Sequence, residues 1–541
     1  MSPLPRRERL AEYALKGVHL GLRQLAVAPE QVTARRLADQ ARQVAPDASR
    51  GPRVAFVTPR DWAVHVQWEG MLAQALRLRG ADVSFVTCGG GLELCDRVNT
   101  YEGPPMPCTT CTRYVHGSID AHGFPRIALR EGWATDDPGD WPELDELSLP
   151  ELFDVVADGV PLGHLFEIPL RWFLVKSQID EEPLAPLTMR RFLRAGRRAA
   201  RGLAHSLDQL RPDVVVALNG LFFFESIALE LCKQRGIPAV VYERGFLPGT
   251  LLVHQGHPDT LLDIPDEVWM GDDMTLTADE EEELDRYLED RRFGRRTMDM
   301  YWKRGTRHEM ADAKSGGRTV AAFTNLTWDS AVLGQELAFS SIHDWLVGAV
   351  EWARDNPEHE LVVRIHPAEV KLPGKQTREP LAAYLRQRVH PMPANVLILD
   401  AEDPTSSYVL MEACDVGLVF SSTAGLELAV FGAPVIVAGR THYRGKGFTI
   451  DVSSPEEFRA ALDAVVADPA AFAPDQALAR RYAYAFFFRA PIQGPFVEEH
   501  VPGLARITID RIDPLLPGRT PGIDRLCAEV LGAAAVPTPP S

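Results

Sequence analysis

The stretch from residue 413 to residue 451, ACDVGLVFSSTAGLELAVFGAPVIVAGRTHYRGKGFTID, decides the fold. Its apolar run 416–420 predicts a buried strand. The pattern of residues 426–431 predicts a helix that ends at Gly432, where a C-cap glycine belongs. The apolar residues 435–437 predict a second strand. A strand, polar turn, helix and strand in this order form the repeating unit of a parallel α/β sheet.

The polar turn is the first candidate binding site. Between strand and helix stand Ser421, Ser422, Thr423 and Gly425. Ligands of open α/β sheets bind at the carboxyl ends of strands, and the free N–H groups of a helix N-terminus suit a phosphate. Glu427 lies one turn into the helix, where it can accept hydrogen bonds from a ribose. The alternative is an ordinary crossover with polar caps.

Two segments of this stretch, SSTAGLELAVFGAPVIVAG and YRGKGFT, resemble the donor-binding part of GT-B glycosyltransferases. The capsule polysaccharide biosynthesis family, with its Kdo-transferase-like enzymes, is the most similar group. That family carries a His-Pro pair after a strand, and LVVRIHPAE places His366 and Pro367 after the predicted strand 361–365. The resemblance covers residues 317–455 well and the N-terminal half only in general layout.

The resemblance implies an α/β GT-B fold, in which two Rossmann-like domains face a central cleft. The expected parts are a helical extension (1–50), an acceptor domain with a cysteine cluster and an insertion (51–265), a linker (266–316), a donor domain (317–478) and C-terminal return helices with a tail (479–541).

The resemblance also implies a nucleotide-sugar donor held mainly by the second domain. Its phosphates would meet the 421–425 turn, His366, Arg364 and Lys446, and Asn325 would lie beside them after the first strand of that domain. His366 could act as an imidazolium or as a neutral hydrogen-bond donor. The sequence has no Asp-x-Asp triplet, so we predict transfer without a catalytic metal.

Three residues of the first domain are candidate general bases for an inverting reaction. Asp61 and His65 follow the predicted strand 54–58, and Glu243 follows the predicted strand 239–242. Both strand ends should face the cleft. A solvated histidine at a helix start and a local salt bridge of Glu243 are the competing interpretations.

Four cysteines within a short stretch predict a structural zinc site. Cys88, Cys95, Cys108 and Cys111 have the spacing C-x6-C-x12-C-x2-C. Two thiolates as close as the last pair can share one tetrahedral ion. Reduced, partly buried thiols are the alternative.

Composition and charge limit the partners. The net charge of −18 argues against a nucleic-acid binder, and no apolar run reaches the length of a membrane span. The expected partner is a glycan or lipid-linked glycan acceptor, and the expected location is the cytoplasm.

Two basic helices could touch the inner membrane surface. One has an apolar stripe from Leu10 to Leu25, and the other carries six arginines between 190 and 201. We favour a helix packed on its own domain and a solvated charged face, respectively.

Three functions stay open. They are a glycosyltransferase that builds a cell-surface or capsule-type glycan, a GT-B-fold nucleotide-sugar epimerase and a non-catalytic nucleotide-sugar-binding subunit. The elaborate region 90–210 argues against an epimerase, which needs no acceptor site.

Overall fold

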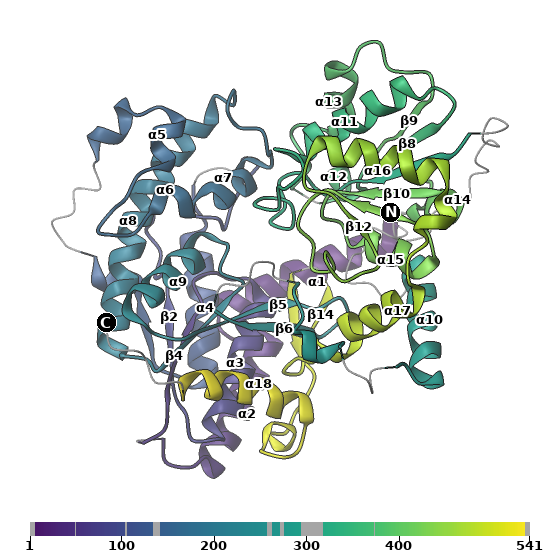
Figure 1. Ribbon diagram of the computed structural model, residues 1–541. Coiled ribbons are helices and arrows are strands. Elements are labelled where there is room, and N and C mark those ends of the chain that lie inside the picture. The colour runs from purple at the N-terminus through teal and green to yellow at the C-terminus, as the bar shows by residue number, and fades with distance from the viewer. Residues whose placement is uncertain are drawn as a thin grey trace. The chain divides into compact units, whose positions relative to one another are not determined.

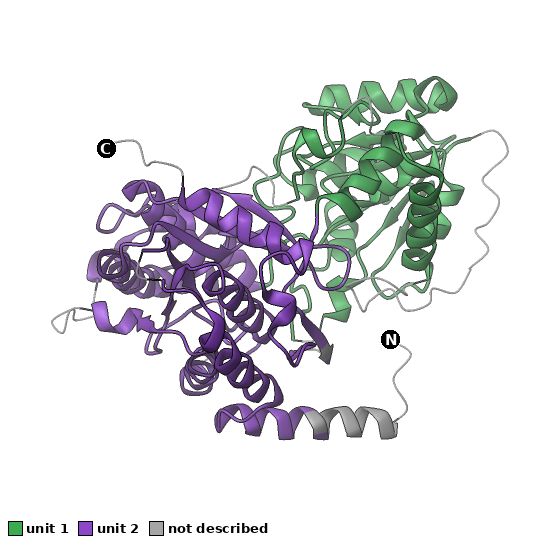
Figure 2. Ribbon diagram, turned by 90° about the horizontal axis from the view of Figure 1, so that it is seen from below, with its two compact units in different colours: residues 1, 175–177, 259–490 green, residues 2–174, 178–258, 491–541 purple. Residues whose placement is uncertain are grey.

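The computed structural model (Figure 1) describes residues 6–48, 50–102, 105–133, 141–256, 262–270, 275–293, 317–372, 374–501 and 503–535. The chain forms two compact units (Figure 2). Unit 1 comprises residues 175–177 and 259–490, and unit 2 comprises residues 2–174, 178–258 and 491–541. The sequence predicted that the first domain ends at residue 265 and the donor domain at residue 478. In the structure, the corresponding boundaries between the units fall after residues 258 and 490.

The sheet of unit 2 has seven strands in the order β13-β6-β5-β4-β1-β2-β3. Their bounds are β1 Arg53–Val57, β2 Asp82–Thr87, β3 Arg126–Ala128, β4 Val214–Leu218, β5 Ala239–Arg244, β6 Thr250–Gln255 and β13 Ile492–Gln493. β1 to β5 are parallel, whereas β6 and β13 are antiparallel to their neighbours. The strand order reverses between β1 and β4, so these two strands flank the position where doubly wound sheets bind ligands.

Helices cover both faces of this sheet. Along β1, Val54 and Phe56 enter one hydrophobic core and Ala55 and Val57 enter the other. The first core is shared with α2 (Pro29–Val44), α3 (Ala63–Arg77), α4 (Cys108–His122) and α18 (Pro521–Ala534). The second is shared with α5 (Leu149–Phe153), α6 (Leu162–Leu165), α7 (Glu167–Leu174), α8 (Leu184–Leu210) and α9 (Phe223–Arg235). Burial of both faces explains why the strands are apolar without alternation.

Unit 1 contains six parallel strands in the order β12-β11-β10-β7-β8-β9. Their bounds are β7 Thr319–Phe323, β8 Glu360–Arg364, β9 Val396–Leu399, β10 Val416–Val419, β11 Val435–Val437 and β12 Ile450–Asp451. Counted along the chain, this is the order 3-2-1-4-5-6 of a Rossmann sheet, with its reversal between β7 and β10. The predicted fold class, α/β with two Rossmann-like halves, is confirmed.

The helices of unit 1 are α10 (Ala278–Arg292), α11 (Ile342–Asp355), α12 (Ala368–Lys371), α13 (Leu381–Arg388), α14 (Ser407–Ala413), α15 (Ala424–Phe431), α16 (Pro455–Ala467), α17 (Gln476–Tyr484) and the π-helix η6 (Ala485–Arg489). α10 lies in the segment predicted as a linker. It packs within unit 1, where the Tyr287 ring contacts the Phe487 ring at a tilt with centroids 4.9 Å apart and Glu280 pairs with Arg489 at 2.7 Å. Two parts of the predicted linker, 271–274 and 294–316, lie outside the described residues.

The C-terminal segment returns to unit 2, as predicted. β13 adds to the edge of its sheet beside β6, and α18 packs on it (Figure 1). Between them, β14 (Val497–Val501) and β15 (Leu504–Ile507) form an antiparallel hairpin. The indole N–H of Trp68 on α3 donates to the Val497 carbonyl at 3.2 Å, which ties the hairpin to the unit.

The C-terminal half of α1 (Arg6–Gln24), whose side chains the structure describes, packs on unit 2 through polar residues. Val18 and Leu25 of the predicted apolar stripe are 64% and 71% exposed. Among the side chains of α1 that the structure describes, the buried ones are His19 and Arg23, which pair with Glu30 at 2.7 and 2.9 Å. A buried carboxylate needs a charge partner, so Glu30 of α2 turns the polar face of α1 inward.

The arginines of α8 pair with acidic groups of their own unit. Arg194 binds Asp145 at 2.8 Å, and Arg201 binds Asp158 at 2.7 Å. Arg190 donates to the carbonyl of Leu144 at 2.7 Å. These contacts give the basic face a local role. Among the described residues, no helix is both long enough and apolar enough to cross a membrane.

Candidate functional site

The carboxyl ends of β7 and β10 meet at the switch point of unit 1. Thr324 and Asn325 follow β7, and the turn 421–425 follows β10. The Ser421 hydroxyl donates to the Ala331 carbonyl at 2.7 Å, which joins the two loops. The sequence-predicted turn and Asn325 therefore lie at the edge where a Rossmann sheet binds its ligand.

The turn presents backbone donors at the start of α15. The N–H groups of Ser421, Ser422 and Thr423 donate to no residue that the structure describes. The Ser422 hydroxyl accepts from the Ala424 N–H at 3.3 Å, and the Tyr443 hydroxyl donates to the Ser422 carbonyl. Unused N–H groups at a helix N-terminus form an anion site, so the turn fits a phosphate.

His366 follows β8, which is separated from β10 by β7. Its backbone N–H donates to the Thr324 hydroxyl at 2.9 Å, and its Nδ1 accepts the Ala368 N–H at 3.2 Å. Burial, helped by Arg364 and Lys371, lowers the pKa of His366 to about 4. The imidazole is thus neutral at pH 7 with its single proton on Nε2. Of the two predicted forms, this geometry favours the neutral donor.

Arg364 serves the neighbouring loop. It is buried, and its guanidinium donates to the carbonyls of Asp400 and Asp403 at 2.8 and 3.2 Å. These bonds fix the chain after β9. A contact of Arg364 with donor phosphate would compete with its two carbonyl bonds.

Asn325 differs from Arg364 in this respect. Its Oδ1 is buried and accepts no hydrogen bond from the described part of the chain.

Glu427 and Lys446, predicted donor contacts, both have protein partners. Glu427 is buried and accepts from Arg291 at 2.7 Å and from the Tyr408 hydroxyl. Lys446 pairs with Asp266 at 2.9 Å. Binding of a ribose by Glu427 would therefore replace or share one of its bonds, and its role in donor binding stays a prediction.

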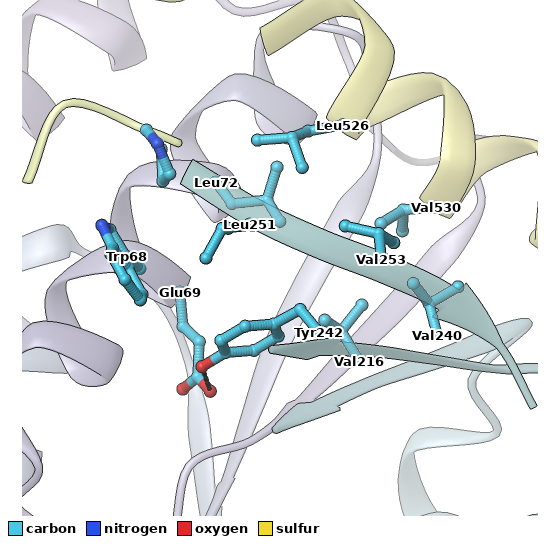
Figure 3. A pocket seen from close by; sticks show the side chains of 11 residues that line it. Trp68, Glu69, Leu72, Val216, Val240, Tyr242, Leu251, Val253, Leu526 and Val530 are labelled. Atoms are coloured by element: carbon cyan, nitrogen blue, oxygen red, sulfur yellow. Dashed lines mark hydrogen bonds between the residues drawn. The ribbon is translucent and has the colours of Figure 1, made fainter. Parts of the chain in front are cut away.

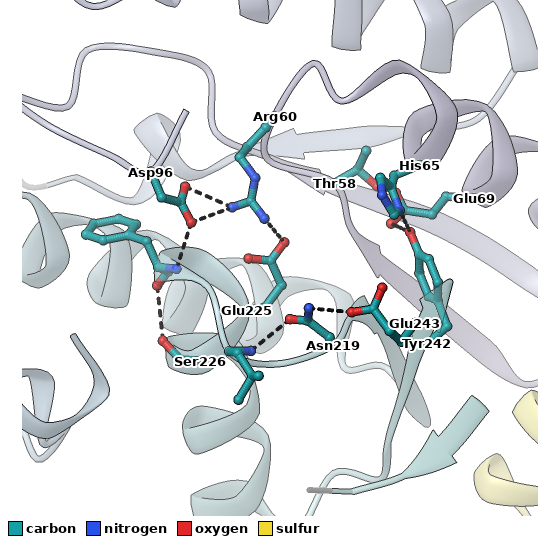
Figure 4. Close-up of polar contacts among 12 residues, drawn as sticks. Thr58, Arg60, His65, Glu69, Asp96, Asn219, Glu225, Ser226, Tyr242 and Glu243 are labelled. Atoms are coloured by element: carbon teal, nitrogen blue, oxygen red, sulfur yellow. Dashed lines mark hydrogen bonds and ion pairs between the residues drawn. The ribbon is translucent and has the colours of Figure 1, made fainter. Parts of the chain in front are cut away.

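The three predicted base candidates of unit 2 differ in their surroundings. Asp61 forms an ion pair with Arg97. Glu243 accepts from the Asn219 amide at 2.8 Å and from the Arg244 N–H at 2.7 Å. His65 lies with its Nδ1 3.3 Å from the Tyr242 hydroxyl (Figure 4).

Sequence reasoning missed a buried charge cluster at the switch point of unit 2. Arg60 binds both oxygens of Asp96 at 3.0 and 3.1 Å and Glu225 at 2.7 Å (Figure 4). Burial raises the pKa of Glu225, and its Oε2 has no partner within the described ranges. The three residues lie far apart in the chain, and no spacing pattern links them. The one signal in the sequence was the position of Arg60 directly after β1, at a strand end where ligand-binding residues are expected.

The four cysteines do not form a metal site in the structure. Among the described residues, no three His, Cys, Asp or Glu side chains come together as ligands. Burial raises the pKa of Cys88 to about 11 and those of Cys95 and Cys111 further. Zinc stays a prediction from spacing, and elemental analysis of the purified protein tests it.

Comparison with known proteins identifies one family whose model matches part of this chain. The model of the family described as capsule polysaccharide biosynthesis protein matches residues 281–495, which confirms the resemblance over that range. The comparison with curated proteins found no match.

Solved structures with partial similarity include two transferases and one epimerase. Thermosulfurimonas dismutans KpsC, a beta Kdo 2,4 transferase, is 17% identical with a TM-score of 0.34, over 56% of this chain and 86% of that one. The glycosyltransferase SnogD from Streptomyces nogalater is 15% identical with a TM-score of 0.25, over 82% and 98%. UDP-GlcNAc 2-epimerase from Neisseria meningitidis is 11% identical with a TM-score of 0.24, over 81% and 97%.

Proposed function

We propose that this protein is a glycosyltransferase that moves a sugar from a nucleotide-sugar donor to a capsule-type glycan acceptor. The family match over residues 281–495 includes the 421–425 turn and His366. One observation carries the proposal: unused N–H groups of the turn lie at the switch point of a Rossmann sheet, and a neutral histidine follows the second strand along the same sheet edge.

In the proposed reaction, unit 1 binds the nucleotide half of the donor. The N–H groups of the turn and Nε2–H of His366 would stabilise the negative charge that develops on the leaving phosphate. The helix dipole of α15 adds to this without a metal ion. The acceptor oxygen bonds to the anomeric carbon as the bond from that carbon to the phosphate oxygen breaks. Unit 2 would supply the acceptor side.

The nucleotide is identified first. A thermal-shift panel of CMP, UDP, GDP and dTDP should show one nucleotide that raises the melting temperature most, because a ligand that binds only the native state stabilises it. Incubation of the matching nucleotide sugars without acceptor then separates the alternatives. Epimerisation would indicate the epimerase, and tight binding without turnover, even with glycan acceptors, would indicate a binding subunit.

Substitution of His366 tests the mechanism. We expect His366→Ala to lower turnover by about 10²–10³-fold, the scale for one donor to a developing charge, with a much smaller change in nucleotide affinity. His390→Ala, an exposed histidine of the same unit, is the matched control and should remain active. Full activity of His366→Ala would contradict the assignment of the donor site.

A further inference from the structure

A buried chain of hydrogen bonds lies behind His65 in unit 2. His65 and Glu69 stand one turn apart on α3, so their side chains share a face of the helix. Tyr242 reaches them from β5, and Thr58 follows β1. Figure 4 shows the four side chains side by side, apart from the cluster around Arg60.

When Glu69 is a carboxylate, which can only accept, the contacts fix the direction of this chain. The Tyr242 hydroxyl donates to Glu69 Oε1 at 2.6 Å, and the Thr58 hydroxyl donates to Glu69 Oε2. A phenol has a single proton, and Tyr242 donates it in the hydrogen bond to Glu69. Toward His65 Nδ1, 3.3 Å away, the Tyr242 oxygen can therefore only accept a hydrogen bond. His65 then carries its proton on Nδ1, and Nε2 keeps a free lone pair.

The far side of the chain is closed to competing partners. Glu69 and Tyr242 line one end of a cavity of about 20 Å³ whose other walls are mostly apolar (Figure 3). Leu72, Val216 and Val240 are among those walls. No polar group there can take the place of Tyr242, and burial raises the pKa of Glu69 to about 8. The carboxyl group is thereby held to Thr58 and Tyr242.

Aromatic rings hold the imidazole in place. Trp68 meets the His65 ring edge-on at 5.4 Å between centroids, and Trp62 lies at 6.1 Å. Burial lowers the pKa of His65 to about 3, so the ring is neutral. The residue is only half-buried, and Nε2 forms no hydrogen bond with any described residue. Nε2 is therefore the nitrogen that can meet a substrate.

We propose that Tyr242 and Glu69 are positioning residues that hold His65 in the tautomer whose Nε2 takes the proton of the acceptor hydroxyl. This inference rests on the proposed glycosyltransferase function and selects one base from three candidates. Asp61 is held by Arg97, and Glu243 already accepts two hydrogen bonds.

The proton balance of the step is complete. The acceptor O–H proton moves to Nε2 while the oxygen forms its bond to the anomeric carbon. The bond between that carbon and the phosphate oxygen breaks, and the phosphate leaves with the electron pair. His65 becomes an imidazolium, whose Nδ1–H stays on the Tyr242 oxygen. The sugar inverts at its anomeric carbon, and product-anomer NMR would detect this.

The first test measures the tautomer without any substrate. Full-length protein labelled with ¹⁵N-histidine is studied by NMR one pH unit above the pKa of Glu69, where that group is a carboxylate. We expect the His65 signals of a neutral ring protonated on Nδ1, assigned by their loss in His65→Asn. Tyr242→Phe should shift this ring toward the Nε2–H form. A wild-type ring protonated on Nε2 would overturn the proposal even if the protein transfers no sugar.

The second test is kinetic. Tyr242→Phe should lower kcat by at least about 10-fold and leave KM within about twofold, since loss of a tautomer-fixing partner can cost up to roughly 10⁴-fold in kcat. Glu69→Gln, which keeps the shape of the side chain, should lower kcat in the same way.

The matched control is Tyr114→Phe. Tyr114 is another buried tyrosine of unit 2, and its hydroxyl lies 3.3 Å from Glu30. This variant should keep the wild-type kcat. Suppose that His65→Asn inactivates the enzyme but that neither Tyr242→Phe nor Glu69→Gln changes kcat. That result would overturn the positioning role. Transfer that survives His65→Asn would overturn the choice of base and leave the proposed function intact.

Discussion

At the scale of single residues, Glu427 separates an expected ligand contact from a structural one. Its position one turn into α15 fits a ribose contact, yet its carboxylate joins Arg291 of α10 to Tyr408 of α14. All three side chains belong to unit 1. The ion pair with Arg291 is almost fully buried. Removal of one partner from a buried pair is costly because the other charge stays behind uncompensated.

We therefore predict that Glu427→Gln destabilises unit 1 by about 3–5 kcal/mol, the range for a broken buried pair. Urea unfolding of the variant measures this change. Glu282→Gln is the matched control, since Glu282 pairs with Arg286 on the exposed face of α10 and should cost at most about 0.5 kcal/mol. Wild-type stability together with a loss of about 1–3 kcal/mol in nucleotide affinity would instead support the ribose role.

The sequence predicted which residues lie at the strand ends better than it predicted the hydrogen-bond partners of those residues. Arg364 and His366 were both predicted at the end of one strand, and Arg364 lies near enough to lower the pKa of His366. The carbonyls that Arg364 binds belong to Asp400 and Asp403, which only the packing of β9 against β8 brings near. Buried polar groups find partners across the fold, and a local pattern carries no record of them.

At the scale of elements, the turn before α15 depends on one glycine. Gly425 is buried, and an added Cβ would overlap the Tyr443 hydroxyl. That hydroxyl holds the Ser422 carbonyl. We predict that Gly425→Ala costs about 1–3 kcal/mol in stability, as overpacking does, and weakens nucleotide binding because the turn must shift.

A double-mutant cycle with Tyr443→Phe checks this cause. Removal of the hydroxyl opens space for the new methyl group, so the cost of Gly425→Ala should be smaller in the Tyr443→Phe background. Calorimetric unfolding and nucleotide titration of the four proteins provide the measurement. Strictly additive costs would show that the clash does not involve Tyr443.

Long periodic elements could be predicted, whereas their orientation could not. The strands around 416–420 and 361–365 and the cap at Gly432 are where the sequence placed them. α1 is also helical, but Val18 and Leu25 of the predicted apolar stripe are exposed, because Glu30 on the next helix requires His19 and Arg23. Periodicity shows which face is apolar and cannot show which buried charge needs a partner.

At the scale of the whole molecule, buried titratable groups make stability depend on pH. Burial lowers the pKa of five histidines to about 3 or 4, namely His65, His122, His343, His366 and His442. Burial raises the pKa of Glu69 to about 8 and of Glu369 to about 7, and it also raises that of Glu225. The two kinds of group have opposite effects on the free energy of unfolding.

The signs follow from where protons bind. Below its ordinary pKa of 6.5, each such histidine is protonated in the unfolded chain and neutral in the native one, so stability falls as pH falls. Each such glutamate keeps a proton in the native state that the unfolded chain loses above about 4.5, so stability falls as pH rises. Between these two ordinary values both effects act, and they oppose each other at about 1.4 kcal/mol per proton and pH unit.

The balance differs between the units. Unit 1 holds His343, His366 and His442 against Glu369, whereas unit 2 holds two such histidines against Glu69 and Glu225. The smaller shifts of Asp329 in unit 1, whose pKa burial raises, and of His116 in unit 2, whose pKa burial lowers, reduce this difference without removing it. We therefore predict that unit 1 loses about 2–3 kcal/mol per pH unit between pH 6.5 and 5, the linkage of about two net protons, and that unit 2 loses little.

Pulsed hydrogen exchange across urea titrations measures both units at once, because peptides of each report its own unfolding midpoint. Between the two pH values, the midpoint of unit 1 should fall much further than that of unit 2. His366→Gln removes one of the responsible groups and should reduce the pH slope of unit 1 by about 1.4 kcal/mol per unit, with unit 2 as the internal control. Equal slopes in the two units would contradict this account, since equal slopes would mean that the buried histidines do not govern the acid response.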